Sequence, residues 1–569
     1  MFTSPLRRTI PLKRISGRQS GYLAVRRDPR GSRCFLAQDY HNNRSPGGRG
    51  TDSSPQSSVV RSSVQWSASS PFAFLGLAIG VVGGWLLNQQ DVVKDLDQQP
   101  YATVGEMERA VGEIEQQLGP DSVSTDSEIL RAHGYSEWST VNIDRLPVAV
   151  VFPNSTEDVS SIAKICHKYN VPIIPYSGGS SVEGNFSAPF GGISVDFCNM
   201  ASIVKFRPED MDITVQPGMS WVQMNNIISS SGLFFPIDPG PSAQLGGMIG
   251  TNCSGTNAIR YGTMKDWVVN LTVVLSDGTI VKTRRRPRKS SAGYNLNSII
   301  VGSEGTLGLV TEATLKLAPI PTHTGVAVIS FPTIKTAASM AIDVVRRGIT
   351  VGCIEILDDV QMRVINQIGA TGRTWREEPT LFLKFTGDEE LVNHSIRAVQ
   401  EVAKAHGNPA MEFENDAEKQ KVLWSARKEA LWSMLALRKS GSEVWTTDVA
   451  VPLSRVADLI ELSKQDLDSL DLFGSIIGHV GDGNFHETIL FDGAKERSRV
   501  EQSVHRMVDR ALEMEGTCTG EHGIGLGKID SLQDELGEGP LAMMRAIKTS
   551  LDPKWLMNPG KIFHRQATK

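Results

Sequence analysis

The sequence has few cysteines and no pair of them at metal-binding spacing. Its 6 cysteines are scattered over 569 residues, with no Cys-x-x-Cys pair and no regular interval. This disfavours both a disulfide framework and a cysteine-based zinc site. An excess of basic residues is also missing, because the formal net charge is -5 at pH 7. The charge argues against a nucleic-acid-binding protein, whose affinity rests on contacts with phosphates.

Two common nucleotide-binding motifs are missing as well. No glycine-rich loop ends in the Lys-Ser or Lys-Thr of a P-loop, and no Gly-x-Gly-x-x-Gly directly follows a predicted strand. ATP and Rossmann-bound NAD are therefore disfavoured as ligands. The sequence has no internal repeat, and its 40% hydrophobic and 21% charged residues are typical of soluble proteins. A chain of 569 residues exceeds one hydrophobic core, so two or more domains are expected.

The first hundred residues differ from the rest of the chain in charge and in residue composition. Residues 1–50 contain ten arginines and only two acids, which predicts a mitochondrial presequence, with a disordered basic tail as the alternative. A disordered linker is expected over residues 51–70. The uncharged run at 71–87 is just long enough for a transmembrane anchor, and a buried soluble helix is the rival interpretation.

Charges on either side of this run predict its orientation. Basic residues precede it, whereas Asp91, Asp95 and Asp97 follow it. The positive-inside rule then leaves the N-terminus in the mitochondrial matrix and the main body in the intermembrane space, attached to the inner membrane. Without its N-terminal arginines the chain is distinctly acidic, which suits a basic docking partner such as cytochrome c.

The body from about Tyr101 onward is expected to be α+β. A β-α-β unit is predicted from the strand Val148–Phe152, the helix Val159–Tyr169 and the strand Val171–Pro175, with Ser155 and Asp158 marking the helix start. Asp277-Gly278 predicts a hairpin turn, and a domain boundary is expected near 319–324. The later strands and helices are predicted at Leu271–Leu275, Thr279–Thr283, Leu309–Leu317, Ile334–Arg347, Thr380–Phe385 and Leu391–His406.

Three glycine-rich loops stand out in the first half of the body. Glycines allow consecutive backbone N–H groups to turn toward one anion, and neighbouring hydroxyls add donors. One such loop is usually a simple turn, but three in one domain predict a pyrophosphate site. The candidate residues are Pro175, Ser177, Gly178, Gly179, Ser180, Ser181, Gly184 and Asn185; Pro239, Gly246, Gly247, Gly250, Thr251, Asn252, Ser254 and Gly255; and Gly302, Glu304, Gly305 and Gly308.

A cluster of histidines and a glutamate stands out in the second half. His479 and His486 lie an odd number of residues apart, so a regular strand would point them to opposite faces. The glycines between them allow a bend that could bring the imidazoles together. With Glu521 as third ligand they would suit zinc, manganese or iron, and His522 would be free for proton transfer. The alternative is two buried histidines around a hairpin turn.

These motifs resemble known flavoprotein families. The three loops, in this order and at these separations, resemble the FAD-binding domain of the vanillyl-alcohol-oxidase type over roughly Val148–Pro319. The segments HVGDGNFH and GEHGIG, with Asn558-Pro559-Gly560-Lys561, resemble the C-terminal domain of the D-lactate, D-2-hydroxyglutarate and glycolate dehydrogenases. The resemblance implies a two-subdomain FAD-binding domain at 100–320, followed at 321–565 by an α+β substrate domain with an antiparallel sheet.

The resemblance also implies roles for the candidate residues. The first two loops would hold the FAD pyrophosphate, the third would run beside the ribityl and adenine portion, and Asn558 would contact the cofactor. Ser180 and Ser181 stand where some members carry a flavin-linked histidine, so non-covalent FAD is expected. A divalent metal, zinc or manganese, would be bound by His479, His486 and Glu521.

The expected reaction is oxidation of a 2-hydroxy acid, D-lactate, to its keto acid, pyruvate. His522 would take the hydroxyl proton of the metal-bound substrate, the C2 hydride would move to flavin N5, and electrons would pass to cytochrome c. Arg427 would hold the carboxylate, unless it is a helix-surface arginine. By resemblance, 447–452 borders the substrate pocket.

Other readings of the function stay open at this point. D-2-hydroxyglutarate is the alternative substrate, and Lys428, Arg438 or Lys439 could meet its distal carboxylate. A matrix member of the family would instead serve an electron-transfer flavoprotein. Two alternatives from other classes are a metal-dependent hydrolase and a non-catalytic membrane flavoprotein.

Overall fold

The structure, a computed structural model, describes residues 101–137, 139–408 and 410–565. The presequence, linker and apolar run predicted over residues 1–87 lie outside this part of the chain. Within the described ranges, no helix is long and apolar enough to cross a membrane.

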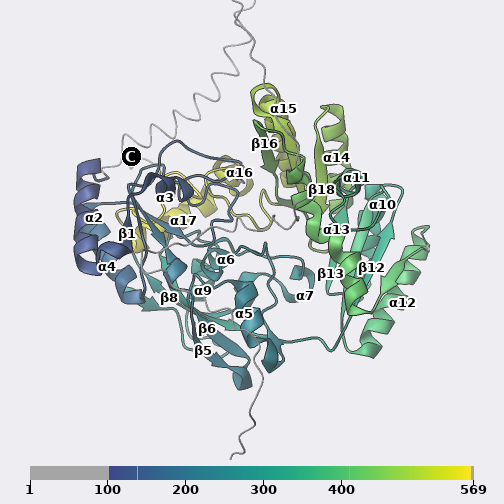
Figure 1. Ribbon diagram of the computed structural model, residues 1–569, viewed down its shortest axis with the longest axis horizontal. Helices are drawn as coiled ribbons and strands as arrows, with labels where there is room; N and C mark the ends of the chain where they lie inside the picture. Colours follow the sequence, from purple (N-terminus) through teal and green to yellow (C-terminus); the bar gives the residue numbers. More distant parts are fainter. Residues whose placement is uncertain (1–100, 138, 409, 566–569) are drawn as a thin grey trace, which may run out of the picture. The chain divides into compact units, whose positions relative to one another are not determined.

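The predicted β-α-β unit opens the first half of the body and is confirmed (Figure 1). Its helix begins three residues earlier than predicted, because the Ser155 side chain caps it by accepting from the Asp158 N–H. In sheet order β1-β2-β4-β3, the last three strands are parallel and β1 is antiparallel. The elements of this part are α2 (Val104–Leu118), β1 (Val123–Ser124), α3 (Ser127–Ala132), β2 (Ala149–Val151), α4 (Thr156–Tyr169), β3 (Ile173–Tyr176) and β4 (Ile193–Asp196).

A five-stranded antiparallel sheet of order β5-β6-β10-β8-β9 follows. The predicted Asp277-Gly278 hairpin joins β8 to β9, and Gly278 adopts a φ of +83° that favours glycine. The strands are β5 (Ile203–Arg207), β6 (Asp212–Val215), β8 (Val268–Val274), β9 (Ile280–Lys282) and β10 (Leu309–Lys316), with β7 (Leu233–Phe234) pairing β11 (Ala318–Pro319) beside them. The helices are α5 (Trp221–Ile228), α6 (Leu245–Thr251), α7 (Ala258–Tyr261), α8 (Met264–Trp267) and α9 (Leu296–Ile300).

The second half is built on one large antiparallel sheet, as expected for the substrate domain. Its strand order is β15-β12-β14-β13-β18-β19-β16, and β17 also pairs with β19. The strands are β12 (His323–Ser330), β13 (Cys353–Leu357), β14 (Thr380–Gly387), β15 (Glu412–Glu414), β16 (Ser442–Thr446), β17 (Val449–Ala450), β18 (Gly474–Gly478) and β19 (Asn484–Asp492). The helices are α10 (Ile334–Arg346), α11 (Asp359–Ile368), α12 (Glu389–Ala405), α13 (Ala417–Ala436), α14 (Val456–Ser469) and α15 (Gly493–Glu513).

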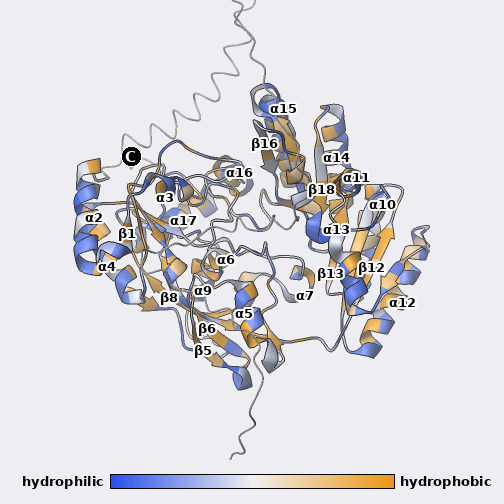
Figure 2. Cartoon of the chain, viewed as in Figure 1, coloured by the Kyte–Doolittle hydropathy of each residue, from blue (hydrophilic) through white to orange (hydrophobic). Residues whose placement is uncertain are grey.

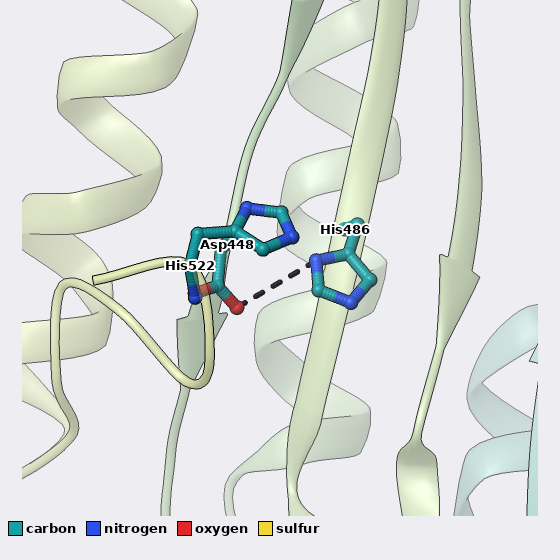
Figure 3. A group of neighbouring side chains, drawn as sticks. All are labelled: Asp448, His486 and His522. Carbon is teal, nitrogen blue, oxygen red and sulfur yellow. Dashed lines mark hydrogen bonds and ion pairs between the residues drawn. The ribbon is translucent and has the colours of Figure 1, made fainter. Parts of the chain in front are cut away.

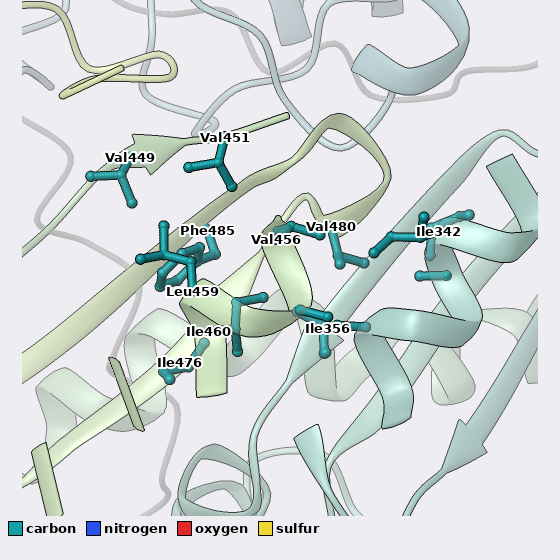
Figure 4. Close-up of a cluster of buried hydrophobic side chains, with 14 of the residues drawn as sticks. Ile342, Ile356, Val449, Val451, Val456, Leu459, Ile460, Ile476, Val480 and Phe485 are labelled. Atoms are coloured by element: carbon teal, nitrogen blue, oxygen red, sulfur yellow. The ribbon is translucent and has the colours of Figure 1, made fainter. Parts of the chain in front are cut away.

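Both faces of this sheet are covered, and strand alternation decides which side chain joins which core. On β14, Leu381 and Leu383 enter a large cluster that includes α10, α12 and α14, part of which Figure 4 shows. The intervening Phe382 enters the cluster on the α13 side instead. Helices that cover the sheet, such as α12, carry both polar and apolar residues (Figure 2). The face toward α13 is the one that carries the candidate site.

The C-terminal segment returns to the first half of the body. Figure 1 draws α16 (Ile529–Leu536) and α17 (Glu538–Leu551) among its elements. Beyond α17 the chain runs beside β3: the Ile173 N–H donates to the Leu556 carbonyl at 2.8 Å, and the Asn558 N–H donates to the Ile173 carbonyl at 2.8 Å. The buried Lys548 ammonium donates to the Thr306 carbonyl at 2.6 Å. These bonds bring Asn558 to the third glycine-rich loop.

Candidate active site

One pocket of about 660 Å³ joins the glycine-rich loops to the large sheet. Twenty-two of the twenty-six residues predicted for the site line it, including His479, His486, Glu521, His522 and Arg427. The four that do not are Gly184, Asn252, Ser254 and Gly302. Ser254 is nevertheless connected to the site, because its hydroxyl donates to the Glu521 carboxylate at 2.6 Å.

Two glycines of the loops, Gly178 and Gly305, are required by close contacts between the loops. A Cβ on Gly178 would lie 2.7 Å from the Ser242 carbonyl oxygen. A Cβ on Gly305, which also has a φ of +73°, would lie 2.3 Å from the Pro175 ring. The Ser177 hydroxyl joins the first loop to the second by donating to the Gln244 side chain at 2.9 Å. The resulting wall of backbone and hydroxyl groups fits a dinucleotide pyrophosphate.

The predicted metal ligands lie together at the other end of the pocket. A short turn at Val480–Asp482, closed by Gly483 with φ +79°, makes the bend that the sequence suggested. It places the Nε2 atoms of His479 and His486 at 3.3 and 3.4 Å from the same Glu521 oxygen. The three side chains can therefore face one ion.

The far side of each imidazole is fixed by an acceptor. His479 Nδ1 lies 2.8 Å from the Glu355 carboxylate, and His486 Nδ1 lies 3.0 Å from the Thr447 carbonyl. Such bonds set the tautomer that leaves Nε2 free to bind a metal. Burial acts to lower the pKa of His479, but the Glu355 and Glu521 carboxylates raise it well above its ordinary value. The carboxylates around His479 thus favour a positive charge at this place. The two imidazoles and the carboxylate of His479, His486 and Glu521 are ligands that fit a divalent cation.

His522 lies beside this group and stacks on His486, with ring centroids 4.9 Å apart and planes 12° apart. Burial lowers the pKa of His522 to about 4, so its imidazole is neutral at physiological pH. Its Nδ1 atom is buried and has no hydrogen-bond partner within the described ranges. A neutral imidazole in the pocket wall can accept a proton.

Asp448 lies beside His486 and His522 (Figure 3), and its hydrogen bonds organise the loop that carries Glu521 and His522. One of its carboxylate oxygens accepts from the N–H groups of Gly520, Glu521 and His522, at 2.7, 2.8 and 3.0 Å, and from the Thr519 hydroxyl at 2.7 Å. The other oxygen accepts from the Asn484 amide at 2.7 Å. Asp448, His486 and His522 form a second group with metal-ligand spacing. Because both Asp448 oxygens are engaged, we interpret Asp448 as a positioning residue.

Arg427 lies on α13 in the pocket wall, and its side chain is only 16% exposed. Its Nε donates to the Glu355 carboxylate at 2.8 Å. Glu355 therefore bridges Arg427 to His479. Burial opposes ionisation of Glu355, but His479 and Arg427 hold its pKa below the usual value. Of the three cations considered for a second carboxylate, only Lys428 lines the pocket.

Sequence reasoning missed Glu355 and assigned no role to Asp448 itself. Glu355 is an acid in the apolar strand Cys353–Leu357 and is almost fully buried. A charged side chain within so apolar a strand was the one available signal, because buried charges need partners. Asp448 lies in the segment expected to border the substrate pocket, but nothing in its neighbours indicates the four donors that converge on one of its oxygens.

A model for the FAD binding domain matches residues 147–284, and one for the C-terminal domain of FAD linked oxidases matches residues 320–562. The mitochondrial D-lactate dehydrogenase (cytochrome) of Kluyveromyces lactis is 45% identical over 483 residues, which cover 83% of this chain and 84% of that protein. The Arabidopsis thaliana protein of the same name is 45% identical over 514 residues, which cover 89% of this chain and 90% of that protein.

The fold of this chain is also similar to the folds of solved structures. The 4-ethylphenol oxidase of Gulosibacter chungangensis has a TM-score of 0.67 at 16% identity, covering 82% of this chain and 98% of that chain. At this identity the likeness concerns the fold alone, and it confirms the expected vanillyl-alcohol-oxidase type. The family models and curated relatives together show that this chain belongs to the family of FAD-linked oxidases that includes the mitochondrial D-lactate dehydrogenases.

Proposed function

We propose that this chain catalyses the FAD-dependent oxidation of D-lactate to pyruvate and passes the electrons to cytochrome c. The observation that carries the proposal is the convergence of His479, His486 and Glu521 beside His522, at one end of a pocket whose other end is built from glycine-rich loops. The names of the relatives, D-lactate dehydrogenase (cytochrome), support the choice of substrate and acceptor.

Arg427 binds the substrate carboxylate in this proposal. Its guanidinium suits a planar carboxylate. The Glu355 carboxylate at 2.8 Å holds the Nε side of the group, so Arg427 is oriented before substrate enters. Because the same Glu355 also holds His479, the carboxylate-binding arginine and the metal ligand have a common support. Fixed orientation lowers the entropic part of the barrier.

His522 acts as the base. Its low pKa keeps the imidazole neutral, and we assign the hydroxyl proton of the substrate to this imidazole, which lines the pocket. Asp448 holds the His522 backbone N–H and thereby fixes where the imidazole stands. When bound, non-covalent FAD supplies the hydride acceptor, and zinc or manganese at His479, His486 and Glu521 supplies a Lewis acid for the hydroxyl.

We further propose that the protein is attached to the mitochondrial inner membrane through residues 71–87, with its body in the intermembrane space. The arginine-rich composition of residues 1–50 and the uncharged run at 71–87 support this location. The relatives from Kluyveromyces lactis and Arabidopsis thaliana are mitochondrial by name. An acidic body would attract a basic acceptor such as cytochrome c electrostatically.

The test is anaerobic mixing of the purified protein with D-lactate while flavin absorbance is followed. We expect rapid bleaching with D-lactate and not with L-lactate, and recovery of the oxidised spectrum on adding ferricytochrome c. His522→Ala should abolish the bleaching. The matched control is His406→Ala, which removes a histidine that bonds Asp343 away from the pocket.

Other outcomes separate the alternatives. Bleaching only by D-2-hydroxyglutarate assigns the same mechanism to a different substrate. A purified protein without flavin favours the hydrolase, and bound flavin without bleaching by any 2-hydroxy acid favours a non-catalytic flavoprotein. Either of these two results contradicts the proposed function.

A further inference from the structure

A strongly basic segment lies away from the pocket just described. Residues 282–294 run from the last residue of β9 through most of its connection to α9, and they contain six cations and no acid. We call this segment the basic rim. Its cations are Lys282, Arg284, Arg285, Arg286, Arg288 and Lys289. Such a density is unusual in a chain with a net charge of -5, so the segment stands out against an acidic body.

Some cations of the basic rim bind neighbouring parts of the protein and so fix the conformation of the segment. Arg284 donates to the Val269 carbonyl at 2.6 Å, and Arg288 donates to the Met211 carbonyl at 3.1 Å. Arg286 forms the rim's ion pairs, with Asp210 and Asp212. Lys282, Arg285 and Lys289 are exposed and form no ion pair with any residue that the structure describes. The segment is thus tied down while several of its charges face solvent.

An exposed apolar surface adjoins the basic rim. A pocket of about 420 Å³, lined mostly by aliphatic side chains of β8, β9, α9 and α17, opens there. Thr283 of the basic rim and Leu296, two residues beyond its end, both line this pocket, so the two ends of the rim lie close to it. Leu296 and Ile547 are 40% and 37% exposed at its edge.

Two further apolar side chains extend this surface. Tyr294, two residues before Leu296, is 92% exposed. Met543 is 70% exposed and lies one turn before Ile547 on α17, so the two share a helix face. We call Tyr294, Leu296, Met543 and Ile547 the apolar patch.

We propose that the basic rim and the apolar patch together bind the surface of a membrane that contains anionic lipids. Cations attract anionic headgroups, whereas exposed aromatic and aliphatic side chains enter the region between headgroups and acyl chains. Tyrosine is well suited to that depth, because its ring is apolar and its hydroxyl is polar. A nucleic acid would satisfy the cations but leave the aliphatic patch and its pocket unexplained. The surface does not take part in the proposed reaction.

The test is hydrogen–deuterium exchange of the full-length protein with FAD, mixed with lipid vesicles. Exchange over residues 280–296 and 543–551 should slow with vesicles of phosphatidylcholine and phosphatidylglycerol, and not with phosphatidylcholine alone. High salt should weaken the protection without abolishing it, since it screens exposed charges but leaves the apolar contacts. Because the readout is local, membrane binding by another part of the chain does not reproduce it.

Variants sharpen the test. Arg285→Gln with Lys289→Gln should raise the lipid concentration needed for half-maximal protection on the order of 30-fold, the change in affinity expected for losing two cations near an anionic surface. The matched control, Lys404→Gln with Lys421→Gln, removes two exposed cations from α12 and α13 and should leave the protection unchanged. Tyr294→Ser should weaken the protection that remains at high salt.

Two results would overturn the proposal. One is equal exchange with and without anionic vesicles. The other is protection by duplex DNA but not by vesicles, which would assign the surface to nucleic acid. All of these variants should retain D-lactate oxidation with a soluble dye as acceptor, so loss of membrane binding is distinguishable from failure of the proposed reaction.

Discussion

Replacing Asp448 by asparagine tests how the loop carrying Glu521 and His522 is held. Asparagine keeps the shape of the side chain but removes its charge and one acceptor. In the wild-type protein the Asn484 amide donates to the Asp448 carboxylate at 2.7 Å. If the oxygen of the new asparagine stays with the four donors of residues 519–522, the NH2 group of that asparagine faces the NH2 group of Asn484. Asn484 cannot simply flip, because its amide also donates to the Val449 carbonyl at 2.8 Å. At least one buried donor is therefore left facing another donor.

The size of the effect follows from these bonds. Burial opposes ionisation of Asp448, but His522, Lys528 and His486 hold its pKa well below the usual range, so the carboxylate is charged at working pH. Hydrogen bonds to a charged group contribute about 1.5–3 kcal/mol each and neutral ones about 0.5–1.5 kcal/mol. Weakening four such bonds would cost about 4–6 kcal/mol if they were additive. Because all four share one oxygen, we expect a destabilisation of about 3–5 kcal/mol, the range for a buried charge that loses its partner.

The assay combines denaturant unfolding with activity and metal content. We expect Asp448→Asn to lower the unfolding midpoint, kcat/KM and the amount of bound metal together, because the loop supplies both Glu521 and His522. The matched control is Asp196→Asn, which replaces a buried aspartate that accepts from the Cys198 N–H and contacts His133. It should lower stability without loss of metal. Wild-type stability and kcat/KM in Asp448→Asn would refute the reasoning.

Three further predictions follow from burial, loop contacts and ligand geometry. Burial, and then the nearby Asp466 and Asp358, raise the pKa of Glu487 to about 8 from 4.5. The folded state therefore keeps a proton that the unfolded state loses, so stability falls as pH rises from 4.5 to about 8. Glu487→Gln should remove this loss, and its unfolding free energy should exceed that of the wild type by more at pH 8 than at pH 5. Gly305→Ala should release FAD, measured as flavin per protein, because its Cβ would lie 2.3 Å from the Pro175 ring; unchanged flavin content would contradict the loop geometry. Chelation should abolish D-lactate turnover and added zinc or manganese should restore it, whereas full activity in metal-free protein would argue against the ligand set.

Much of the local structure could be predicted from the sequence. The Ser155 cap, the Asp277-Gly278 turn and the short apolar run of β14 depend on residues close together in the chain, so residue pattern and turn chemistry identify them. The glycine-rich loops belong to the same class. The positive φ angles of several of these glycines are a local backbone property, whereas the contacts that exclude a Cβ at Gly178 and Gly305 come from other loops.

The composition of the active site could be predicted in part, through motifs. Two histidines around a glycine bend and a glutamate next to a histidine indicate a ligand set and a base whatever the surrounding fold. The structure brings His479, His486 and Glu521 within reach of one ion, as that pattern suggested. Whether each residue performs its assigned role stays a prediction for the experiments above.

The residues that hold the side chains of the site in place could be identified only from the tertiary structure. Glu355 reaches His479 across 124 residues, and Asp448 reaches the His522 N–H across 74. The return of Asn558 to β3 likewise joins the two ends of the described chain. No periodic pattern encodes such pairs, because they arise from the strand order of the large sheet and from the packing of its helices. The sequence by itself determined which groups can do the chemistry, and the fold determined which buried partners hold them, since a buried charge is stable only where distant donors converge on it.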